Sequence, residues 1–438
     1  MNPSWKLSNS NIVSQIDHSD NYFIVNLLTG NADIMTEEEF TALTKIEPRQ
    51  EFISKGYITT AEIERQLTIT QYLNFIDSRA TDEIQIFFVP WYDCNFACQY
   101  CYQENYNASF ESPDNDIIQS FFSYILKKFV QKEKYLTIFG GEPLLSGKKY
   151  RNFIEHFLDL AKKNELETAI VTNGFYLKDY VELFKNSKIR EIQVTLDGIE
   201  ETHNKRRPLK GGQGTFNQIV EGIQACLDAA IPINLRFVAD RENINELHNL
   251  AKFCIEKNWI NSPFFKTQIG RNYELHHCQE KNERLFDRLS LWRKIYELIA
   301  QYPEIEKYHQ PAFSISKYLY ENGNLPQPLF DSCPGCKSEW AFDGSGKIYS
   351  CTATVGKKGE ELGTFWPKVE LDHSTIEKWQ DRDVESIEDC KVCNLKLACG
   401  GGCASIAKNR TGKINSTDCR PIKELLEMGM NFYFQQRS

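Results

Sequence analysis

Cysteine is the residue type whose spacing in this sequence most clearly points to chemistry. The chain has 14 cysteines in 438 residues, and most of them fall into three groups. In a secreted protein such groups would suggest disulfide bonds, but in a reducing compartment they are typical of metal or iron–sulfur ligation. The groups are Cys94, Cys98 and Cys101; Cys333, Cys336 and Cys351; and Cys390, Cys393, Cys399, Cys403 and Cys419.

The first group has the spacing Cys-x3-Cys-x2-Cys, from Cys94 to Cys101. Such close spacing lets a single loop wrap a cluster, and thiolates bind iron well because both partners are soft. Three thiolates can hold only three irons of a four-iron cubane, so the fourth iron is left for a ligand that is not protein. The spacing therefore predicts a cluster with one open coordination position.

The composition is that of an ordinary globular protein with an acidic balance. Apolar residues make up 41% and charged residues 25%, which excludes a largely disordered chain. Lys plus Arg number 51 against 60 Asp plus Glu, so a nucleic acid is not expected as the main partner. No apolar run reaches the length of a membrane span, and the opening MNPSWKLSNS holds no secretory signal. We therefore expect no membrane partner and a cytoplasmic location.

Strand-like and helical segments alternate around and after the first cysteine group. Such alternation predicts an α/β fold with a parallel sheet and ligands at the carboxyl ends of its strands, where the first cysteine group and several glycines fall. The strand-like runs are 84–90, 135–141, 168–174, 191–198, 232–240 and 264–270. The helical runs are 115–131, 149–164, 179–186, 216–230, 243–258 and 283–302.

Several of these strand ends carry motifs. The loop Cys94–Cys101, Gly140-Gly141-Glu142-Pro143, Thr172-Asn173-Gly174, Leu196-Asp197-Gly198 and the stretch 203–216 occur in this order. Together they resemble motifs of the radical S-adenosylmethionine (SAM) superfamily, in its peptide- and protein-modifying branch. The resemblance covers about residues 84–302. It implies a partial (β/α)6 barrel, a [4Fe–4S] cluster and SAM.

The resemblance also implies a chemistry. Methionine's amino and carboxylate groups chelate the open iron, one electron cleaves the sulfonium, and the resulting 5′-deoxyadenosyl radical abstracts a substrate hydrogen. Cys94, Cys98 and Cys101 are then the catalytic cluster ligands. The implied SAM contacts are Glu142 with the ammonium, Gly140 and Gly141 through close backbone approach, Tyr100 near the adenine, Asn173 and Thr195 with the ribose or carboxylate, and either Arg206 or Arg207 with the carboxylate.

Each of these assignments has a purely structural alternative. A GG pair at a strand end is often only a turn, the basic stretch 205–210 can be a solvated loop, and Phe96 and Tyr100 can simply shield the cluster. Three cysteines stand apart from the groups. Cys226 and Cys254 occupy apolar positions of helices and are predicted core residues, and Cys278 is a loop thiol that could face the substrate.

The second and third cysteine groups resemble the SPASM domain that follows the barrel in some radical SAM enzymes. That resemblance implies two auxiliary clusters, so three [4Fe–4S] clusters are expected in all. Two zinc ions on the same sulfurs are the chemical alternative. The implied ligands are Cys336, Cys351 and Cys403 for the first auxiliary cluster, completed by Cys333 unless that position is open, and Cys390, Cys393, Cys399 and Cys419 for the second.

Three domains are expected: an N-terminal α+β module over 1–80, the barrel over 81–310 and the SPASM domain over 325–438. The module should contain a hairpin over 21–26 and 31–35, a helix over 37–44 capped by Thr36 with Glu39, and a helix over 60–75. The last domain should contain a hairpin over 339–342 and 347–351, a short strand over 362–365 and a helix over 421–434. The module resembles the N-terminal parts of SPASM peptide maturases, which implies leader-peptide recognition by strand addition, or a structural cap.

Three functions compete. The first is a peptide maturase that crosslinks or otherwise oxidises a ribosomally made peptide, or a protein substrate, with an electron donor such as flavodoxin or ferredoxin. The second is an anaerobic sulfatase-maturating enzyme, but that family carries an acid after the cysteine matching Cys351, and this chain has Thr352 there. A threonine cannot accept a proton at neutral pH. The third is a non-catalytic iron–sulfur or zinc scaffold. The first is favoured.

Overall fold

A computed structural model of the chain describes residues 4–103, 106, 110, 113–271 and 282–434. The chain divides into two compact units. The first consists of residues 1–81, 311–333 and 381–438, and the second of residues 82–310 and 334–380. Residues 334–380, which the sequence places with the C-terminal domain, thus belong to the same unit as the barrel.

The second unit is built on one sheet whose strands follow the order β11-β10-β9-β8-β7-β6-β12-β13-β14-β15. Strands β6 to β11 are all parallel, which confirms the α/β fold expected from the alternating pattern. The bounds are β6 Ile84–Val89, β7 Lys134–Ile138, β8 Thr168–Thr172, β9 Ile189–Thr195, β10 Ile233–Ala239, β11 Phe265–Arg271, β12 Glu339–Asp343, β13 Lys347–Tyr349, β14 Gly363–Thr364 and β15 Glu370–Leu371.

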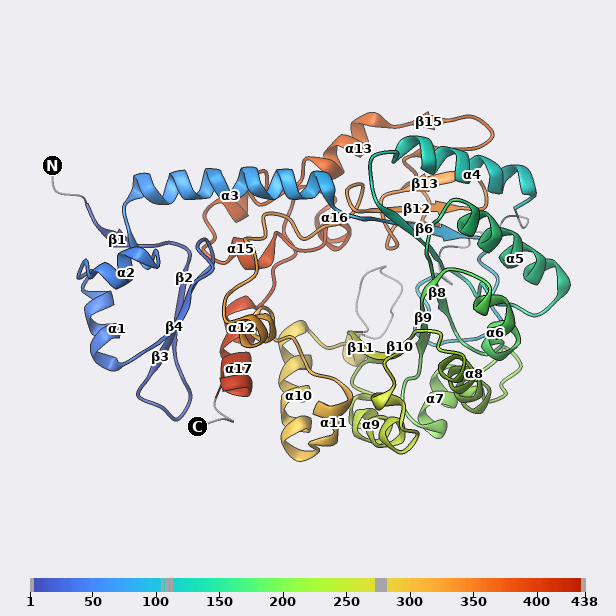
Figure 1. Cartoon of the computed structure of the whole chain (residues 1–438), viewed down its shortest axis with the longest axis horizontal. Coiled ribbons are helices and arrows are strands. Elements are labelled where there is room, and N and C mark those ends of the chain that lie inside the picture. The colour runs from blue at the N-terminus through green and yellow to red at the C-terminus, as the bar shows by residue number, and fades with distance from the viewer. Residues whose placement is uncertain (1–3, 104–105, 107–109, 111–112, 272–281, 435–438) are drawn as a thin grey trace. The chain divides into compact units, whose positions relative to one another are not determined.

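Helices follow the strands of this unit, and those that connect the parallel strands lie on one side of the sheet (Figure 1). They are α4 Asn115–Lys128, α5 Lys148–Lys163, α6 Leu177–Lys185, α7 Glu200–Arg206, α8 Phe216–Asp228, α9 Leu247–Glu256, α10 Arg288–Gln301, α11 Glu304–Tyr308 and α13 His373–Gln380. Strand β10 shows why the two faces of the sheet differ. Its residues Ile233, Leu235 and Phe237 are buried and apolar, whereas Asn234 and Arg236 alternate with them and point to the opposite, inner face.

The hairpin β12–β13 extends the barrel sheet. Strand β12 pairs in parallel with β6, and β13 pairs antiparallel with β12. On the inner face, Ala341 and Tyr349 join a buried cluster with Phe87, Val89 and Phe139. The hairpin predicted over 339–351 is therefore confirmed, and its apolar side completes the core of the barrel.

The first unit begins with small antiparallel sheets. Strands β2 Asn11–Gln15, β3 Tyr22–Asn26 and β4 Ala32–Met35 form one, and β1 Lys6–Leu7 pairs with β5 Ile58–Thr59. The hairpin expected over 21–35 is thus confirmed.

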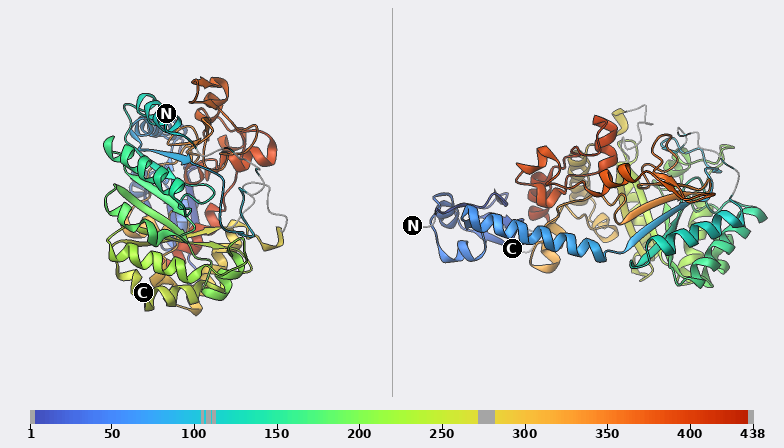
Figure 2. Two further views of the ribbon diagram at one scale, coloured as in Figure 1. Left: turned by 90° about the vertical axis from the view of Figure 1, so that its right-hand side faces the viewer. Right: turned by 90° about the horizontal axis from the view of Figure 1, so that it is seen from above.

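Helices complete the first unit. Helix α1 Glu37–Thr44 has the predicted capping box of Thr36 and Glu39, which satisfies backbone N–H groups that the helix itself cannot. Helix α3 is one continuous rod (Figure 2). The helices are α1, α2 Gln50–Ser54, α3 Ala61–Thr81, α12 Ser316–Asn322, α14 Glu388–Lys391, α15 Lys396–Cys399, α16 Ala404–Thr411 and α17 Ile422–Phe434. Among the described residues, no helix combines the length and apolar character that crossing a membrane requires.

Candidate functional site

The first cysteine group lies in the loop that follows β6. Burial raises the pKa of the Cys94 thiol to about 12, and the charges of Glu142, Cys98 and Cys101 add to the effect. Burial likewise raises the pKa of Cys98 to about 11. The three thiols are therefore close enough to act on one another. Since a thiol must lose its proton to bind iron, a bound metal has to supply the free energy of that deprotonation.

The glycine pair after β7 lies against this loop. Gly140 and Gly141 both have positive φ angles, 86° and 50°. A Cβ on Gly140 would lie 2.7 Å from a methyl of Val89, and one on Gly141 would lie 2.4 Å from the carbonyl oxygen of Asp93. Only glycine permits both the backbone conformation and the contact. The motif therefore holds the loop after β7 directly against the cysteine loop.

Glu142 connects two strand ends. Its carboxylate accepts hydrogen bonds from Thr172 Oγ1 at 2.5 Å, Asn173 N at 2.6 Å and Leu144 N at 2.8 Å. The side chain is buried, and burial raises its pKa to about 7 although these donors and Arg207 lower it. Its structural role is to join the ends of β7 and β8. The ammonium contact expected for Glu142 stays a prediction.

Asn173 reaches from the end of β8 to the cysteine loop. Its Nδ2 donates to Asn95 Oδ1 at 2.8 Å and lies 3.9 Å from the sulfur of Cys94. The N–H of Phe96 also donates to that sulfur, at 3.4 Å. Hydrogen-bond donors around a thiolate stabilise its negative charge, so Asn173 and the N–H of Phe96 favour the deprotonated form of Cys94.

The end of β9 supplies an anion to the same region. Asp197, fully buried, accepts a hydrogen bond from the Tyr100 hydroxyl at 2.6 Å. Tyr100 in turn accepts one from Arg207 Nη1 at 2.7 Å. The cysteine loop is therefore tied to β9 through its tyrosine. Asp197 was visible in the sequence only as part of a motif, and its partners depend on the fold.

The structure separates the two arginines between which the sequence left the choice open. Arg206 is almost fully buried and binds Asp240 through two nitrogens, each at 2.9 Å, and Asp197 through Nε at 3.2 Å. Its charge is already neutralised. Burial lowers the pKa of Arg207, but the charges of Cys98, Tyr100 and Asp197 outweigh it and raise that pKa. Arg207 is thus the arginine beside the cysteine group.

The residues around the cysteines fit a cluster and a polar cofactor. Three buried polar atoms there have no hydrogen-bond partner among the described residues, namely Asn95 Nδ2, Gln103 Nε2 and Arg207 Nε. Buried polar groups are normally paired, so such atoms favour a ligand with matching groups. Among the described residues, no three side chains converge as closely as a single metal ion requires. Thr195, another expected contact, is buried at the end of β9.

The first unit gathers the proposed ligands of the second auxiliary cluster. Burial raises the pKa of Cys390 to about 11, and the neighbouring Cys399, Cys393 and Cys419 raise it further. Fully buried Arg382 holds the surrounding loops, because it donates to the carbonyl oxygens of Gly401 at 2.7 Å, Ser416 and Ile414 at 2.9 Å and Gly402 at 3.1 Å. These loops flank Cys399, Cys403 and Cys419 in the sequence.

The four proposed ligands of the first auxiliary cluster are divided between the units, with Cys333 and Cys403 in the first and Cys336 and Cys351 in the second. In the first unit, the charge of Cys333 acts on Cys403, whose pKa is raised mainly by burial. In the second unit, the N–H of Cys336 donates to the carbonyl of Ser350, the residue before Cys351. Whether these four thiols bind one cluster stays a prediction.

Glu339 of β12 lies next to the residue that follows Cys351. The carboxylate of Glu339 accepts a hydrogen bond from Thr352 N at 2.7 Å, and burial raises the pKa of Glu339. A carboxylate is therefore present beside the position after Cys351, and it comes from β12 rather than from the next residue in the sequence.

The cysteines outside the three groups are Cys226, Cys254 and Cys278. Cys226 and Cys254 are fully buried, which confirms them as core residues, and Cys278 lies outside the described residues.

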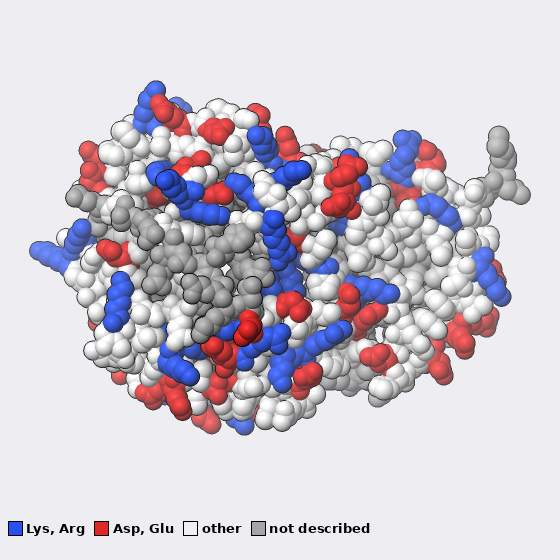
Figure 3. Space-filling model, turned by 180° about the vertical axis from the view of Figure 1, so that it is seen from behind, with Lys and Arg blue, Asp and Glu red and all other residues white. Residues whose placement is uncertain are grey.

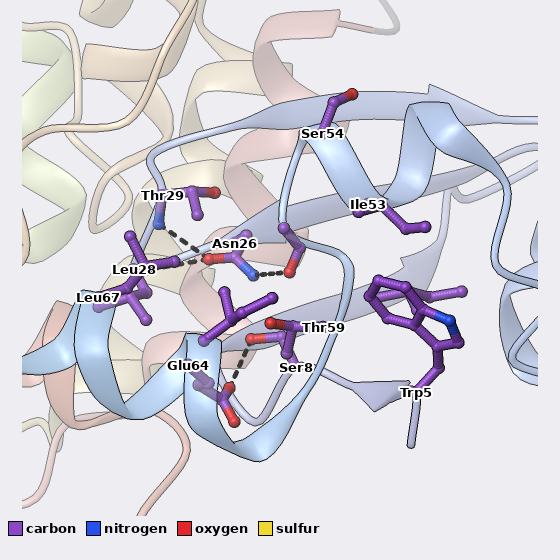
Figure 4. A pocket seen from close by; sticks show the side chains of 13 residues that line it. Trp5, Ser8, Asn26, Leu28, Thr29, Ile53, Ser54, Thr59, Glu64 and Leu67 are labelled. Atoms are coloured by element: carbon purple, nitrogen blue, oxygen red, sulfur yellow. Dashed lines mark hydrogen bonds between the residues drawn. The ribbon is translucent and has the colours of Figure 1, made fainter. Parts of the chain in front are cut away.

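The N-terminal module contains a cavity of about 190 Å³ (Figure 4). Apolar side chains of Trp5, Leu28, Ile53 and Leu67 line it. Glu64 also lines it, and its carboxylate accepts a hydrogen bond from the Ser8 hydroxyl at 2.7 Å. The cavity is thus mostly apolar, with its one carboxylate already bound by neighbours.

Charged side chains of both signs are distributed over the face that Figure 3 shows, with Lys and Arg interspersed among Asp and Glu. The expectation that nucleic acid is not the main partner stays a prediction.

A family model and several known proteins match part of the chain. The model of the radical SAM superfamily matches residues 88–254. The GTP 3′,8-cyclase of Campylobacter jejuni subsp. doylei is 30% identical over 168 residues, covering 37% of this chain and 50% of that protein. The chain therefore spans about half the length of the first such relatives. The GTP 3′,8-cyclase of Helicobacter pylori is 26% identical over 312 residues, covering 67% of this chain and 91% of that protein.

Solved structures share the fold. The structure of anSMEcpe with AdoMet and a peptide bound has a TM-score of 0.62 at 16% identity, covering 81% of this chain and 98% of that one. SuiB of Streptococcus suis, bound to precursor peptide SuiA, has a TM-score of 0.55 at 13% identity, covering 95% and 99%. Identities this low show the fold alone. The chain contains a radical SAM domain, which spans residues 88–254, from β6 to α9.

Proposed function

We propose that this chain is a radical SAM enzyme that oxidatively modifies, and specifically crosslinks, a ribosomally made peptide. The single observation that carries the proposal is the set of three neighbouring thiols, Cys94, Cys98 and Cys101, in a cradle of buried polar groups. Cys94, Cys98 and Cys101 would hold a [4Fe–4S] cluster, which together with bound SAM would supply a 5′-deoxyadenosyl radical after one-electron reduction.

The protein's own residues bind, orient and shield in this proposal. Arg207 supplies a positive charge beside Cys98 for the carboxylate of SAM, since Arg206 is committed to Asp240. Glu142 and Asn173 hold the loops of the cradle, and Asn173 also donates toward the Cys94 sulfur. Buried Phe96 and half-buried Tyr100 limit the access of water to Cys94 and Cys98, which are partly buried, whereas Cys101 is exposed.

A peptide substrate also accounts for the features of the N-terminal module. Strand β4 is an edge of its sheet, because among the described strands it pairs with β3 alone. A peptide can add a further strand to such an edge. The same module contains an apolar cavity that could hold an anchoring side chain of the peptide. The C-terminal thiols would hold auxiliary clusters that carry electrons between the substrate and a donor such as flavodoxin or ferredoxin.

One observation favours a second candidate, the oxidation of a Cys or Ser side chain of a sulfatase to formylglycine. The sequence argued against it because Thr352 stands where that family has an acid. The Glu339 carboxylate, 2.7 Å from Thr352 N, supplies an acid at this place from another strand. The candidate therefore stays as the alternative, and the substrate assay has to include it.

The test is anaerobic reconstitution, followed by incubation with SAM, a reductant and candidate substrates. The substrates to be tested are short peptides encoded by genes beside this one, a sulfatase-derived peptide containing Cys, and GTP. We expect 5′-deoxyadenosine and, with the precursor peptide alone, a product lighter by two hydrogens without fragmentation at the crosslink. Conversion of the sulfatase peptide would establish the alternative, and a cyclised nucleotide would establish a cyclase.

A further inference from the structure

The inner face of β10 carries an arginine, Arg236, that has no counter-ion among the described residues. Arg236 lies in the middle of the strand, between the fully buried Leu235 and Phe237 that face the helices. Its Nε is buried, and no residue in the described part of the chain forms a hydrogen bond with that atom or an ion pair with the guanidinium. Burying a guanidinium N–H without a partner costs free energy, so an anion that binds Arg236 from outside the chain would be stabilising.

The acids that share this face are committed elsewhere. Glu191 pairs with Lys266 and accepts from Asn234, and Asp240 and Asp197 are both bound by Arg206. Arg236 itself pairs in register with Thr195 on β9 and Gln268 on β11, which both lack a carboxylate. No carboxylate of the neighbouring strands is thus left for Arg236.

The neighbouring strand makes room for the guanidinium. A Cβ on Gly270 of β11 would lie 2.7 Å from Arg236 Nε and 2.9 Å from its Nη2. The guanidinium therefore rests on the bare backbone of Gly270, and any other residue there would displace it. The φ angle of Gly270 is not positive, so the backbone conformation there does not require glycine. The physical reason for a glycine at this position is the space that Arg236 occupies.

A second unpaired atom lies on the same face of β10. Asn234 is buried, and its Oδ1 accepts no hydrogen bond from any residue that the structure describes. A strand places Asn234 and Arg236 about 7 Å apart on one face. An acceptor and a cationic donor at that spacing match an extended peptide, which offers an N–H and a carboxylate at similar separations.

We propose that Arg236, seated on Gly270, binds the carboxylate of an acidic side chain in the peptide substrate, and that Asn234 accepts a hydrogen bond from an N–H of the same peptide. The inference rests on the proposed function and narrows its substrate to peptides with Asp or Glu near the modified residue. The competing source of a carboxylate is SAM. Arg207 is better placed to bind the carboxylate of SAM, because its charge interacts with those of Cys98 and Tyr100 in the cysteine loop.

The test measures the reactivity of Arg236 directly and requires no turnover. The anaerobic holoenzyme is treated with phenylglyoxal, and modification of Arg236 is followed by mass spectrometry. The probes are Ac-Ala-Ala-Glu-Ala-Ala-NH2, the same peptide with Gln in place of Glu, and SAM without peptide. We expect the Glu peptide to slow modification several-fold and the Gln peptide to leave it unchanged.

Equal protection by both peptides, or by neither, would overturn the proposal. So would protection by SAM alone as strong as that by the Glu peptide, since the carboxylate would then be the cofactor's. The assay measures chemical modification of the Arg236 side chain and does not depend on catalysis. If the protein made no 5′-deoxyadenosine, the proposed function would be refuted, but the peptide site at Arg236 would still be tested by this assay.

Variants provide a second measurement, the affinity ratio of the Glu and Gln peptides. Arg236→Gln should abolish the preference for Glu, and Arg236→Lys should retain part of it. Gly270→Ala keeps every charge but displaces the guanidinium, so it should also lower the preference. Lys178→Gln, an exposed residue of α6 paired with Glu221, is the control for lost charge and should keep the preference. A preference retained in both Arg236→Gln and Gly270→Ala would refute the site.

Discussion

Arg206 binds Asp240 through both terminal nitrogens, with Nη1–Oδ1 and Nη2–Oδ2 distances of 2.9 Å each. The two side chains are 3% and 0% exposed. Helix α7 and the end of β10 are thus joined by a charge pair that water does not reach. The pair also fixes Asp197, and through it the tyrosine of the cysteine loop.

The first prediction concerns this pair. Arg206→Met leaves the carboxylates of Asp240 and Asp197 buried with less charge compensation, and we expect it to lower the free energy of unfolding by about 3–5 kcal/mol. Urea titration measures the loss. Lys178→Met breaks an exposed pair and should cost less than about 1 kcal/mol. A loss for Arg206→Met as small as the control's would show that the pair does not hold the fold.

The second prediction is the iron content. Three cubanes correspond to about twelve irons per chain, and replacing Cys94, Cys98 and Cys101 together by Ala should remove about four of them. Production of 5′-deoxyadenosine should cease in the same variant. Cys226→Ala, at a buried core thiol, is the matched control and should keep all its iron. Persistent 5′-deoxyadenosine in the triple variant would refute the catalytic assignment.

The third prediction distinguishes the two arginines in SAM binding. Removing Arg207 leaves the carboxylate of SAM without its cation, so Arg207→Gln should weaken SAM binding by about ten- to a hundredfold. Arg207→Lys should recover part of the loss. Calorimetry on the reconstituted enzyme measures both dissociation constants. Unchanged SAM affinity in Arg207→Gln would assign the carboxylate to another group.

The fourth prediction is a dependence of stability on pH. The pKa of Glu142 is raised from 4.5 to about 7, chiefly by burial. The folded chain therefore holds this proton more tightly than the unfolded chain, and its stabilising effect is lost as pH rises from about 4.5 through 7. The loss is at most about 3 kcal/mol.

The measurement for Glu142 compares two metal-free proteins. The free energy of unfolding of Glu142→Gln should fall less between pH 5 and pH 8 than that of the unaltered chain, since Gln does not titrate. Buried His203 has its pKa lowered by burial, Arg207 and Arg206, so it acts in the opposite direction below pH 6.5. Because His203 is present in both proteins, the difference between them isolates Glu142. Parallel pH curves would contradict the prediction.

Much of the site could be predicted from the sequence because its signals are local. The Cys94–Cys101 spacing, the glycine pair before Glu142, and the capping box of Thr36 each lie within a few residues. The alternation of strand-like and helical runs likewise predicted the six parallel strands, with every strand end within three residues of its observed position. Backbone conformation over such short spans depends mainly on neighbouring residues, so the pattern is readable without the fold.

Other features were decided only by the tertiary structure. Nothing near Arg206 or Arg207 in the sequence says that one meets Asp240 and the other lies beside Cys98. The joining of hairpin β12–β13 to β6 depends on residues about 250 positions apart, as the pairing of Glu339 with Gln85 shows. The space that Gly270 leaves for Arg236 arises from the register of two strands. Periodicity gives the faces of a strand, but the partners across those faces are set by packing of the whole unit.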